Sequence, residues 1–353
     1  MWSRSVWRLI RHYRRSAGKE AVREMSTMIP FYKGIWQEAA NWVNADMTEL
    51  GKGVWSIGLG NNRTVIDNFK VQIDDPVVLG IGGDKALCHR LLMQQGLPVP
   101  EHQVFDMSHL EKARQFMEKH EGSLFVIKPS RGTSGAKGIS THVRSFRECR
   151  FSSALASLYG RDIIIERFIP GESYRLLILD GKMILASRRR GLRIAGDGRS
   201  TIRALIEGEN ERRRHNGTPG IRPDRDFHIT LRAQGLTGDS VPEAGVEVLV
   251  KGCDLSMEKG SEVPTRFTES VTGLMCNDLE RVAVQAARII GSRFAGVDII
   301  TLDPSIPLSQ SKGVINEINT TPGLHHHYHL INQENPPPAV YVLKHLLDNS
   351  NAH

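Results

Sequence analysis

Three oxygen-bearing side chains in the last sixth of the chain have the types and spacing of ligands for a hard cation. Glu317 and Asn319 stand two residues apart in GVINEINTTPG, and Asp298 lies in the apolar run FAGVDIITLD. Successive side chains of a strand alternate between faces, so Glu317 and Asn319 point to one side, where Asp298 can join them from a neighbouring strand. Taken alone, the pattern fits equally well an edge-strand charge and an acidic residue close to a turn.

A magnesium ion bound by one or two carboxylates also needs phosphate oxygens, which predicts a phosphate-binding half elsewhere in the chain. Lys85 follows the predicted N-cap residue Asp84, in the first turn of a helix. Lys128 ends an apolar strand and precedes a loop rich in Gly and Ser, whose backbone N–H groups can turn toward an anion. A solvated lysine and an ordinary glycine loop remain the simpler alternatives.

Four arginines stand near the ends of a predicted hairpin. The strand at 174–179 is followed by Asp180-Gly181, a typical hairpin turn, and by a returning strand that ends in three arginines. Arginine suits bidentate recognition of phosphate or carboxylate, although solvated basic residues are the plainer interpretation. The four residues are Arg175, Arg188, Arg189 and Arg190.

The composition bounds the class of protein. With 353 residues, of which 40% are hydrophobic, the chain can bury the core of one large domain or of two to three lobes. Apolar runs with strand and helix periods alternate, which predicts mixed α and β structure. The four cysteines form no C-x-x-C pair, which argues against zinc sites and disulfides. No run is as long and apolar as a membrane span, so we expect a cytoplasmic protein without a transmembrane segment.

The net charge of +7 is concentrated in one arm, because residues 1–25 hold seven basic and two acidic residues. Apolar residues recur there every three or four positions, which predicts a basic amphipathic helix. Such a helix can associate with a membrane surface or an anionic partner, but packing on its own domain or on a dimer mate is the favoured interpretation. Nucleic-acid binding is not expected.

The predicted organisation has three parts. A basic amphipathic arm at 1–28 precedes a small N-terminal lobe at 29–79 and a main domain at 80–350, which carries an insertion or flap at about 196–275. Within the small lobe, the Gly58-x-Gly60 pair indicates a turn between strands and not a nucleotide loop. Capping boxes predict helix starts at Ser108 and Ser145, and helical periods recur at 278–291 and 339–347.

Several motifs, in this order and spacing, resemble the ATP-grasp carboxylate-amine ligases over roughly residues 80–350. They are GDK at 83–85, VIKP at 126–129, ERFIPGESYR at 166–175, GVDII at 296–300 and NEINTTPG at 316–323. Within that superfamily, GDGRSTIRALIEGEN at 196–210 and SVPEAG at 240–245 look most similar to the ATP-grasp part of cyanophycin synthetases. The resemblance implies an α/β (α+β) ATP-grasp fold, in which two lobes clasp ATP.

The resemblance also implies roles for matching residues. Two lysines would bind the ATP phosphates beneath the glycine loop, a hinge near 166–173 would hold adenine, and Glu172 or Ser173 would take the ribose position. The implied ATP-binding set is Lys85, Lys128, Ser130, Gly132, Thr133, Ser134, Gly135, Glu166, Arg167, Phe168, Glu172 and Ser173. Asp298, Glu317 and Asn319 match the magnesium ligands of the superfamily, with two ions expected and Mn²⁺ as a substitute.

The implied reaction phosphorylates a substrate carboxylate with ATP and then lets an amine displace the phosphate to form an amide. Arg175 and Arg189 are the predicted catalytic residues, which hold the acyl phosphate. Thr321, Gly323 and His325 are predicted to contact the amino-acid or peptide substrate. His325, His326, His327 and His329 are expected in an extended segment, where one of them lines the substrate. Related ligases are often oligomers, so a homo-oligomer is expected.

Two other functions stay open at this point. One is a carboxylate-thiol ligase of the same superfamily that uses coenzyme A, and the other is a non-catalytic module that binds ATP or another anion through the basic arm.

Overall fold

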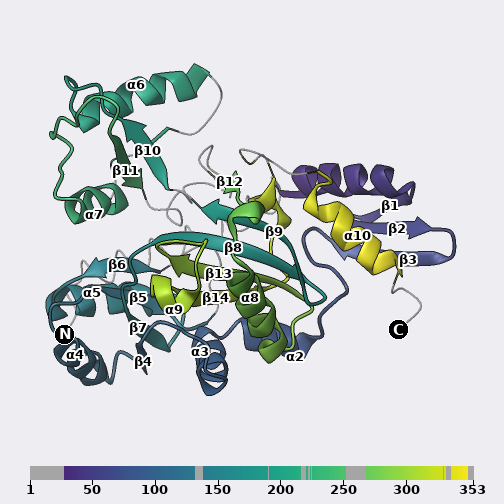
Figure 1. Ribbon diagram of the computed structural model, residues 1–353, viewed down its shortest axis with the longest axis horizontal. Helices are drawn as coiled ribbons and strands as arrows, with labels where there is room; N and C mark the ends of the chain where they lie inside the picture. Colours follow the sequence, from purple (N-terminus) through teal and green to yellow (C-terminus); the bar gives the residue numbers. More distant parts are fainter. Residues whose placement is uncertain are drawn as a thin grey trace.

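The computed structural model describes most of the chain (Figure 1), in the ranges 28–131, 138–189, 191–215, 220–221, 223, 225–251, 268–328, 330 and 335–348. Several predictions fall outside these ranges: the basic arm, Arg190, His329 and the loop residues Gly132, Thr133, Ser134 and Gly135.

A five-stranded antiparallel sheet lies at the centre of the molecule, with the strand order β12-β9-β8-β13-β14. Its strands are β8 (Glu172–Leu179), β9 (Lys182–Arg189), β12 (Glu269–Ser270), β13 (Phe294–Thr301) and β14 (Val314–Thr320). Asp180 and Gly181 join β8 to β9 with φ values of 47° and 78°. Both values are left-handed, as a tight hairpin turn requires, so the predicted hairpin is confirmed.

Three helices accompany this sheet. They are α2 (Pro76–Gly82), α3 (Lys85–Gln94) and α8 (Asn277–Ile290). The buried face of α8 carries Leu279, Val282, Ala286 and Ile290, which pack in one core with β8, β13 and part of α3. Gly291 ends α8 in a left-handed conformation with φ of 85°, close to the predicted end.

A second antiparallel sheet has the strand order β4-β7-β5-β6. Its strands are β4 (His102–Phe105), β5 (Phe125–Pro129), β6 (Ser140–Val143) and β7 (Ile163–Arg167). The helices α4 (Leu110–Lys119) and α5 (Phe146–Ala156) pack on it around a separate apolar core.

The two capping predictions had different outcomes. Ser145 accepts the N–H of Glu148 while the Glu148 carboxylate accepts the N–H of Ser145, so the capping box of α5 is confirmed. The box predicted at Ser108 is wrong, because α4 starts after His109 without a side-chain cap. Asp106 accepts the N–H of Ser108 at 2.8 Å and also contacts His109, so this upstream carboxylate organises the turn instead.

The small N-terminal unit contains a helix that covers residues 28–43 and three antiparallel strands. The strands are β1 (Asp46–Gly51), β2 (Val54–Leu59) and β3 (Asn62–Asp67). Gly60, with φ of 59°, lies in the turn between β2 and β3, as predicted. This unit shares a core with η2 (Leu324–His327) and α10 (Pro338–Asp348), so segments far apart in sequence pack together. The predicted domain boundaries stay a prediction.

The region of the predicted insertion contains a two-stranded sheet and two helices around their own apolar core. The elements are β10 (Leu192–Ala195), α6 (Ile202–His215), α7 (Arg225–Ala233) and β11 (Glu247–Lys251). They form the unit at the upper left of Figure 1. The motifs at 196–210 and 240–245 contact each other. The Gly198 N–H donates to Pro242 O at 3.1 Å, and the Gly245 N–H donates to Gly196 O at 3.0 Å.

The remaining short helices are η1 (Thr272–Leu274) and α9 (Leu308–Ser311). Within the described ranges, every helix falls short of the length or the apolar character that a bilayer crossing requires.

Candidate active site

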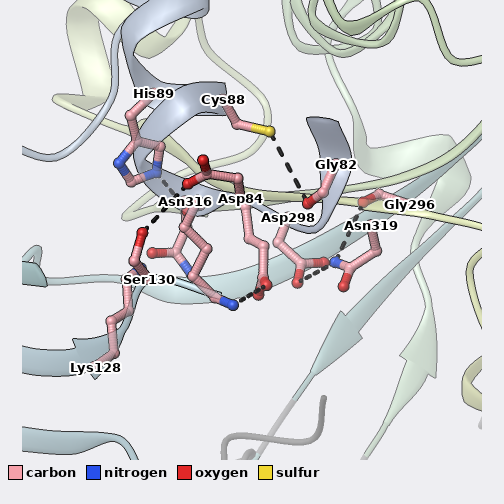
Figure 2. Close-up of polar contacts among 12 residues, drawn as sticks. Gly82, Asp84, Cys88, His89, Lys128, Ser130, Gly296, Asp298, Asn316 and Asn319 are labelled. Carbon is pink, nitrogen blue, oxygen red and sulfur yellow. Dashed lines mark hydrogen bonds and ion pairs between the residues drawn. The ribbon is translucent and has the colours of Figure 1, made fainter. Parts of the chain in front are cut away.

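The three predicted metal ligands lie together on one face of the central sheet. Asp298 on β13 pairs with Glu317 on β14, and Gly296 pairs with Asn319. Directly paired residues of antiparallel strands share a face, which explains the convergence. Figure 2 shows Asn319 beside Asp298, and its amide Nδ2 lies 3.3 Å from Asp298 Oδ2. Asp298 is almost completely buried.

The two predicted catalytic arginines share this face. Arg175 on β8 pairs directly with Asp298, and its Nε and Nη2 atoms donate to the two carboxylate oxygens at 2.6 Å each. Arg189 Nη1 lies 3.8 Å from Asp298 Oδ2. Burial raises the pKa of Asp298, but the charge and hydrogen bonds of Arg175, with the charge of Arg189, outweigh it and hold this pKa below its ordinary value.

Lys85 reaches the same face from the first turn of α3. Its Nζ lies 3.2 Å from Glu317 Oε1, and the side chain is almost fully buried. The helix start is fixed to the end of β5, because the Lys85 N–H donates to Ser130 O at 3.0 Å. Asp84 caps the helix through Leu87 N–H and accepts the Ser130 hydroxyl at 3.2 Å. Figure 2 shows Asp84 and Ser130 facing each other.

Lys128 forms a second buried ion pair, in the four-stranded sheet. Its Nζ lies 2.8 Å from Glu166 Oε1, and both side chains are almost inaccessible. These two residues, on the neighbouring strands β5 and β7, were assigned to the phosphates and to the adenine hinge, respectively. In this structure they neutralise each other, which leaves a charge-balanced pair where two ATP contacts are predicted.

His89 links the two sheets, and the sequence analysis did not single it out. Its Nε2 donates to Asn316 O at 2.9 Å, while Nδ1 lies 3.6 Å from Glu166 Oε1. Burial lowers the pKa of His89 to about 4, a shift that Glu166 only partly opposes, so the ring is neutral. The signal was present in the sequence, since His89 stands one helical turn after Lys85 and therefore faces the same way.

The predicted hinge residues are already engaged within the protein. The N–H groups of Arg167 and Phe168 donate to Glu101 O at 3.0 Å and to Leu124 O at 2.8 Å. The Arg167 side chain turns outward to Glu101, at 2.6 Å. These two N–H groups are therefore engaged within the protein, and the role of residues 166–168 in holding adenine stays a prediction.

The structure separates the two candidates for the ribose position. Glu172 contacts Arg188 at 3.0 Å and Tyr174 at 3.4 Å, and Arg188 and Tyr174 are paired residues of one face. Ser173 pairs with Arg189, so it lies on the opposite face, which also carries Asp298. Because strand side chains alternate, Ser173 shares the face of Asp298, whereas Glu172 lies in an ion-pair network on the opposite face.

The three predicted substrate residues lie after β14. Thr321 adopts a left-handed φ of 50°, which turns the chain, and Gly323 precedes η2. The extended segment predicted here is wrong, because residues 324–327 form a 3₁₀ helix, in which residues three apart lie on the same side. His325 is buried, and its Nδ1 lies 2.6 Å from the Tyr32 hydroxyl of the N-terminal unit.

Two more buried polar side chains near Arg175 escaped the sequence analysis. Ser187 on β9 pairs directly with Arg175, and His327 ends η2. No motif marked the serine, and the histidine was one of four among which the sequence could not choose.

The donor set suits a hard cation. Asp298, Glu317 and Asn319 all offer oxygen atoms, the ligand type that magnesium prefers. In the described segments, no group of three or more His, Cys, Asp or Glu side chains is arranged to hold a metal ion. The oxygen donors alone suit magnesium, whose remaining ligands would be oxygens of a phosphate.

The two antiparallel sheets, bridged by α3 and its charged residues, define an ATP-grasp fold. The crystal structure of a bifunctional glutathione synthetase from Pasteurella multocida is similar to it, with a TM-score of 0.57 and 21% identity, over 86% of this chain and 41% of that one. No family model matches the sequence.

Curated relatives agree with this fold. Cyanophycin synthetase of Trichormus variabilis is 33% identical over 262 residues, which are 72% of this chain and 28% of that protein. A glutathione biosynthesis bifunctional protein of Listeria innocua is 26% identical over 86% of this chain and 39% of its own length. The chain thus spans less than half the length of these relatives. From its similarity to them, it belongs to the ATP-grasp superfamily.

Proposed function

We propose that the protein is an ATP-dependent ligase that joins an amino-acid or peptide carboxylate to an amine. The observation that carries this proposal is the shared face of β8, β13 and β14, where Asp298, Glu317 and Asn319 lie beside Arg175 and Lys85. Relatives that are amide-forming ligases support the same activity. The coenzyme A-dependent and non-catalytic alternatives are not favoured by these relatives.

The reaction has two steps in this proposal. A carboxylate oxygen of the acid takes the terminal phosphoryl group of ATP, which releases ADP and gives an acyl phosphate. The amine then forms a C–N bond while the C–O bond to phosphate breaks, and the proton lost by nitrogen leaves with phosphate. No nucleophile from the protein is needed, so the protein acts by positioning and by charge stabilisation.

Lys85 and Lys128 are proposed to bind the phosphates of ATP. In the structure each is buried and paired with a carboxylate, Glu317 and Glu166, respectively. A polyphosphate can bind each lysine in addition to its carboxylate, so that neither buried carboxylate loses its cationic partner. Serine and glycine residues at 130–135 remain the proposed phosphate loop, and Ser173 the proposed ribose contact.

Asp298, Glu317 and Asn319 would hold magnesium, which would neutralise charge on the phosphoryl group when bound. Arg175 and Arg189 are proposed to take the oxygens of the acyl phosphate, because their guanidinium groups lie beside Asp298. Thr321, Gly323 and His325 are proposed to border the substrate. Two metal ions, substitution by Mn²⁺, a homo-oligomeric state and a cytoplasmic location are further proposals from the resemblance.

Phosphate release from magnesium-ATP, measured across single amino acids and amino-acid pairs with mass spectrometry of the products, tests the function. We expect one pair to stimulate release and to give a product with the summed mass of the pair minus water. Coenzyme A is tested in parallel as the acceptor.

One variant and two contradicting outcomes make this experiment decisive. The variant Arg175→Lys keeps the charge but loses the bidentate geometry, so it should bind ATP and ligate poorly. Phosphate release that requires coenzyme A and gives a thioester would contradict the amide-ligase proposal. Release that no acid in the panel stimulates, with no ligated product, would also contradict an amino-acid substrate.

A further inference from the structure

Two completely buried polar side chains beside the arginines have no hydrogen-bond partner within the described ranges. They are Ser187, through its hydroxyl, and His327, through both ring nitrogens. Leaving a buried polar group unpaired costs about 1–3 kcal/mol, so most such groups in native proteins are satisfied. Two unpaired groups at one place indicate atoms of a ligand that the side chains are arranged to meet.

Ser187 faces the proposed acyl-phosphate site. It pairs directly with Arg175 across β8 and β9, and Arg189 stands two residues further along the same strand. All three side chains therefore lie on one face and present hydrogen-bond donors to it. A hydroxyl on the same face as two guanidinium groups is suited to an oxygen that carries negative charge.

His327 lies at the end of η2 and is completely buried. The ring lies within range of the charges of Arg175, Arg189 and Asp298. Burial, followed by the charge of Arg175, lowers the pKa of His327 to about 3. The ring is therefore neutral and offers one N–H donor and one nitrogen lone pair.

A neutral imidazole near two arginines suits the amine, which is the second substrate of the proposed ligase. An amine must be unprotonated to attack, and neighbouring guanidinium charges favour its neutral form. A carboxylate in place of His327 would pair with an arginine, and a lysine would be repelled. A neutral imidazole can instead accept one N–H of the amine and direct the nitrogen lone pair toward the acyl carbon.

We propose that Ser187 and His327 form the subsite of the reacting groups, in which Ser187 donates to the acyl oxygen and His327 accepts a hydrogen bond from the attacking amine. This inference rests on the proposed function and deepens it. Neither side chain forms or breaks a covalent bond, and the proton lost by the amine leaves with phosphate, as described above.

The chain contains a matched control for the serine. Ser152 on α5 is also completely buried, with no partner for its hydroxyl in the described segments, but its helix packs on the four-stranded sheet. Ser187→Ala and Ser152→Ala each remove one unsatisfied hydroxyl, so both should leave the unfolding midpoint in urea unchanged or slightly higher. Only Ser187→Ala should lower ligation, by about tenfold for one lost hydrogen bond.

The histidine is tested with His327→Leu, which removes both nitrogens, and with His327→Gln, which restores an acceptor. The partly buried His326, on the same turn, supplies the control His326→Ala. Each variant is assayed with the acid and amine found in the amino-acid panel, and separately with concentrated hydroxylamine, which traps the acyl phosphate as a hydroxamate. Hydroxylamine at high concentration needs no oriented binding site.

The expected results separate the two roles. In His327→Leu, amide formation should fall by about tenfold and the KM for the amine should rise, while the KM for ATP and the hydroxamate yield stay within about twofold of wild type. His327→Gln should recover part of the loss. Ser187→Ala should lower hydroxamate and amide formation alike, because the acyl oxygen is common to both reactions.

Equal loss of hydroxamate and amide in His327→Leu, or full activity in that variant, would overturn the role of His327. Unchanged ligation in Ser187→Ala, or an equal loss in Ser152→Ala, would overturn that of Ser187. A wild-type protein that forms neither product with any acid of the panel contradicts the ligase proposal itself, and this inference with it.

Discussion

Asp298 and Glu317 each meet a cation from another element, Arg175 and Lys85, at distances of 2.6 Å and 3.2 Å. Removing one partner of a buried ion pair leaves an uncompensated charge, which typically costs 3–5 kcal/mol. The side chains proposed to bind a metal and phosphates therefore also contribute to the stability of the fold. Substitutions at the site must be judged by activity and stability together.

Glu317→Gln should lower ATP-dependent turnover by at least about a hundredfold, because it removes a charged metal ligand and keeps the shape of the side chain. Glu317 is about a quarter exposed, so the free energy of unfolding should change less than turnover does. The assay is phosphate release with magnesium, alongside urea unfolding.

Glu49→Gln is the matched control, since Glu49 also pairs with a lysine, Lys33, at 3.1 Å, but on the surface. This control should retain wild-type activity. Near-normal turnover in Glu317→Gln would refute the assignment of Glu317 to the metal.

His89 should make the protein less stable in mild acid. Its pKa in the folded protein is about 4, below the ordinary value of 6.5, because burial disfavours the charged ring. Between these two pH values the unfolded chain binds more protons than the folded protein. The contribution of the neutral His89 to the free energy of unfolding is therefore fully present above pH 6.5 and is lost as the pH falls toward 4. In His89→Gln, the free energy of unfolding in urea should decline less between pH 7 and pH 4. An unchanged pH dependence would contradict this assignment.

At the scale of elements, α3 connects the two sheets through its first two turns. Its N-terminus is fixed to the end of β5 by Ser130 and Asp84, and His89 reaches β14 through Asn316. Helix starts in this chain are held in different ways, by a capping box at α5 and by an upstream carboxylate at α4. This difference can be measured.

Ser145→Ala should destabilise the protein by about 1 kcal/mol, because the Ser145 hydroxyl accepts the Glu148 N–H at the start of α5. Ser108→Ala should change the free energy of unfolding by less than about 0.5 kcal/mol, since α4 has no side-chain cap. Urea unfolding of both variants is the measurement. Equal losses would show that the two serines act alike, against the structure.

At the scale of the whole molecule, the candidate site draws residues from two sheets. Lys128 comes from the four-stranded sheet, Asp298 from the five-stranded sheet, and Lys85 from the helix between them. The histidine turn that follows β14 is in turn held by the N-terminal unit, through Tyr32 and His325. A ligand that contacts both sheets should stabilise their relative arrangement.

A non-hydrolysable ATP analogue with magnesium should therefore raise the melting temperature of the protein. At a ligand concentration about a hundred times Kd, the gain is about 2.7 kcal/mol. Lys128→Gln should lose most of this shift at the same ligand concentration, because it removes a phosphate contact. Differential scanning fluorimetry with and without the analogue gives the comparison.

Lys70→Gln supplies the control, since Lys70 is exposed and, among the described residues, forms an ion pair only with the nearby Asp67. It should show the wild-type shift. A full shift in Lys128→Gln would remove Lys128 from the proposed phosphate site.

The sequence alone predicted the elements whose signals are local. The Asp180-Gly181 hairpin, the capped start of α3 and the α8 periodicity depend on neighbouring residues, and each was confirmed. The sequence also predicted that two of the proposed metal ligands share one face, because strand alternation places Glu317 and Asn319 on one side whatever the partner strand is. The pairing that brings Asp298 to them required only that β13 and β14 be neighbours.

Tertiary structure decided what depends on register, burial and long-range contacts. Only the pairing of β8 with β9 shows that Ser187 faces Arg175, and only the pairing of β8 with β13 shows that Asp298 shares that face. Only packing shows that residues 324–327 turn into a 3₁₀ helix that buries His327. A one-residue change in register would exchange the faces of a whole strand, and the Asp180-Gly181 turn alone does not determine this register, because an irregularity between Leu177 and Ile178 shifts the pairing.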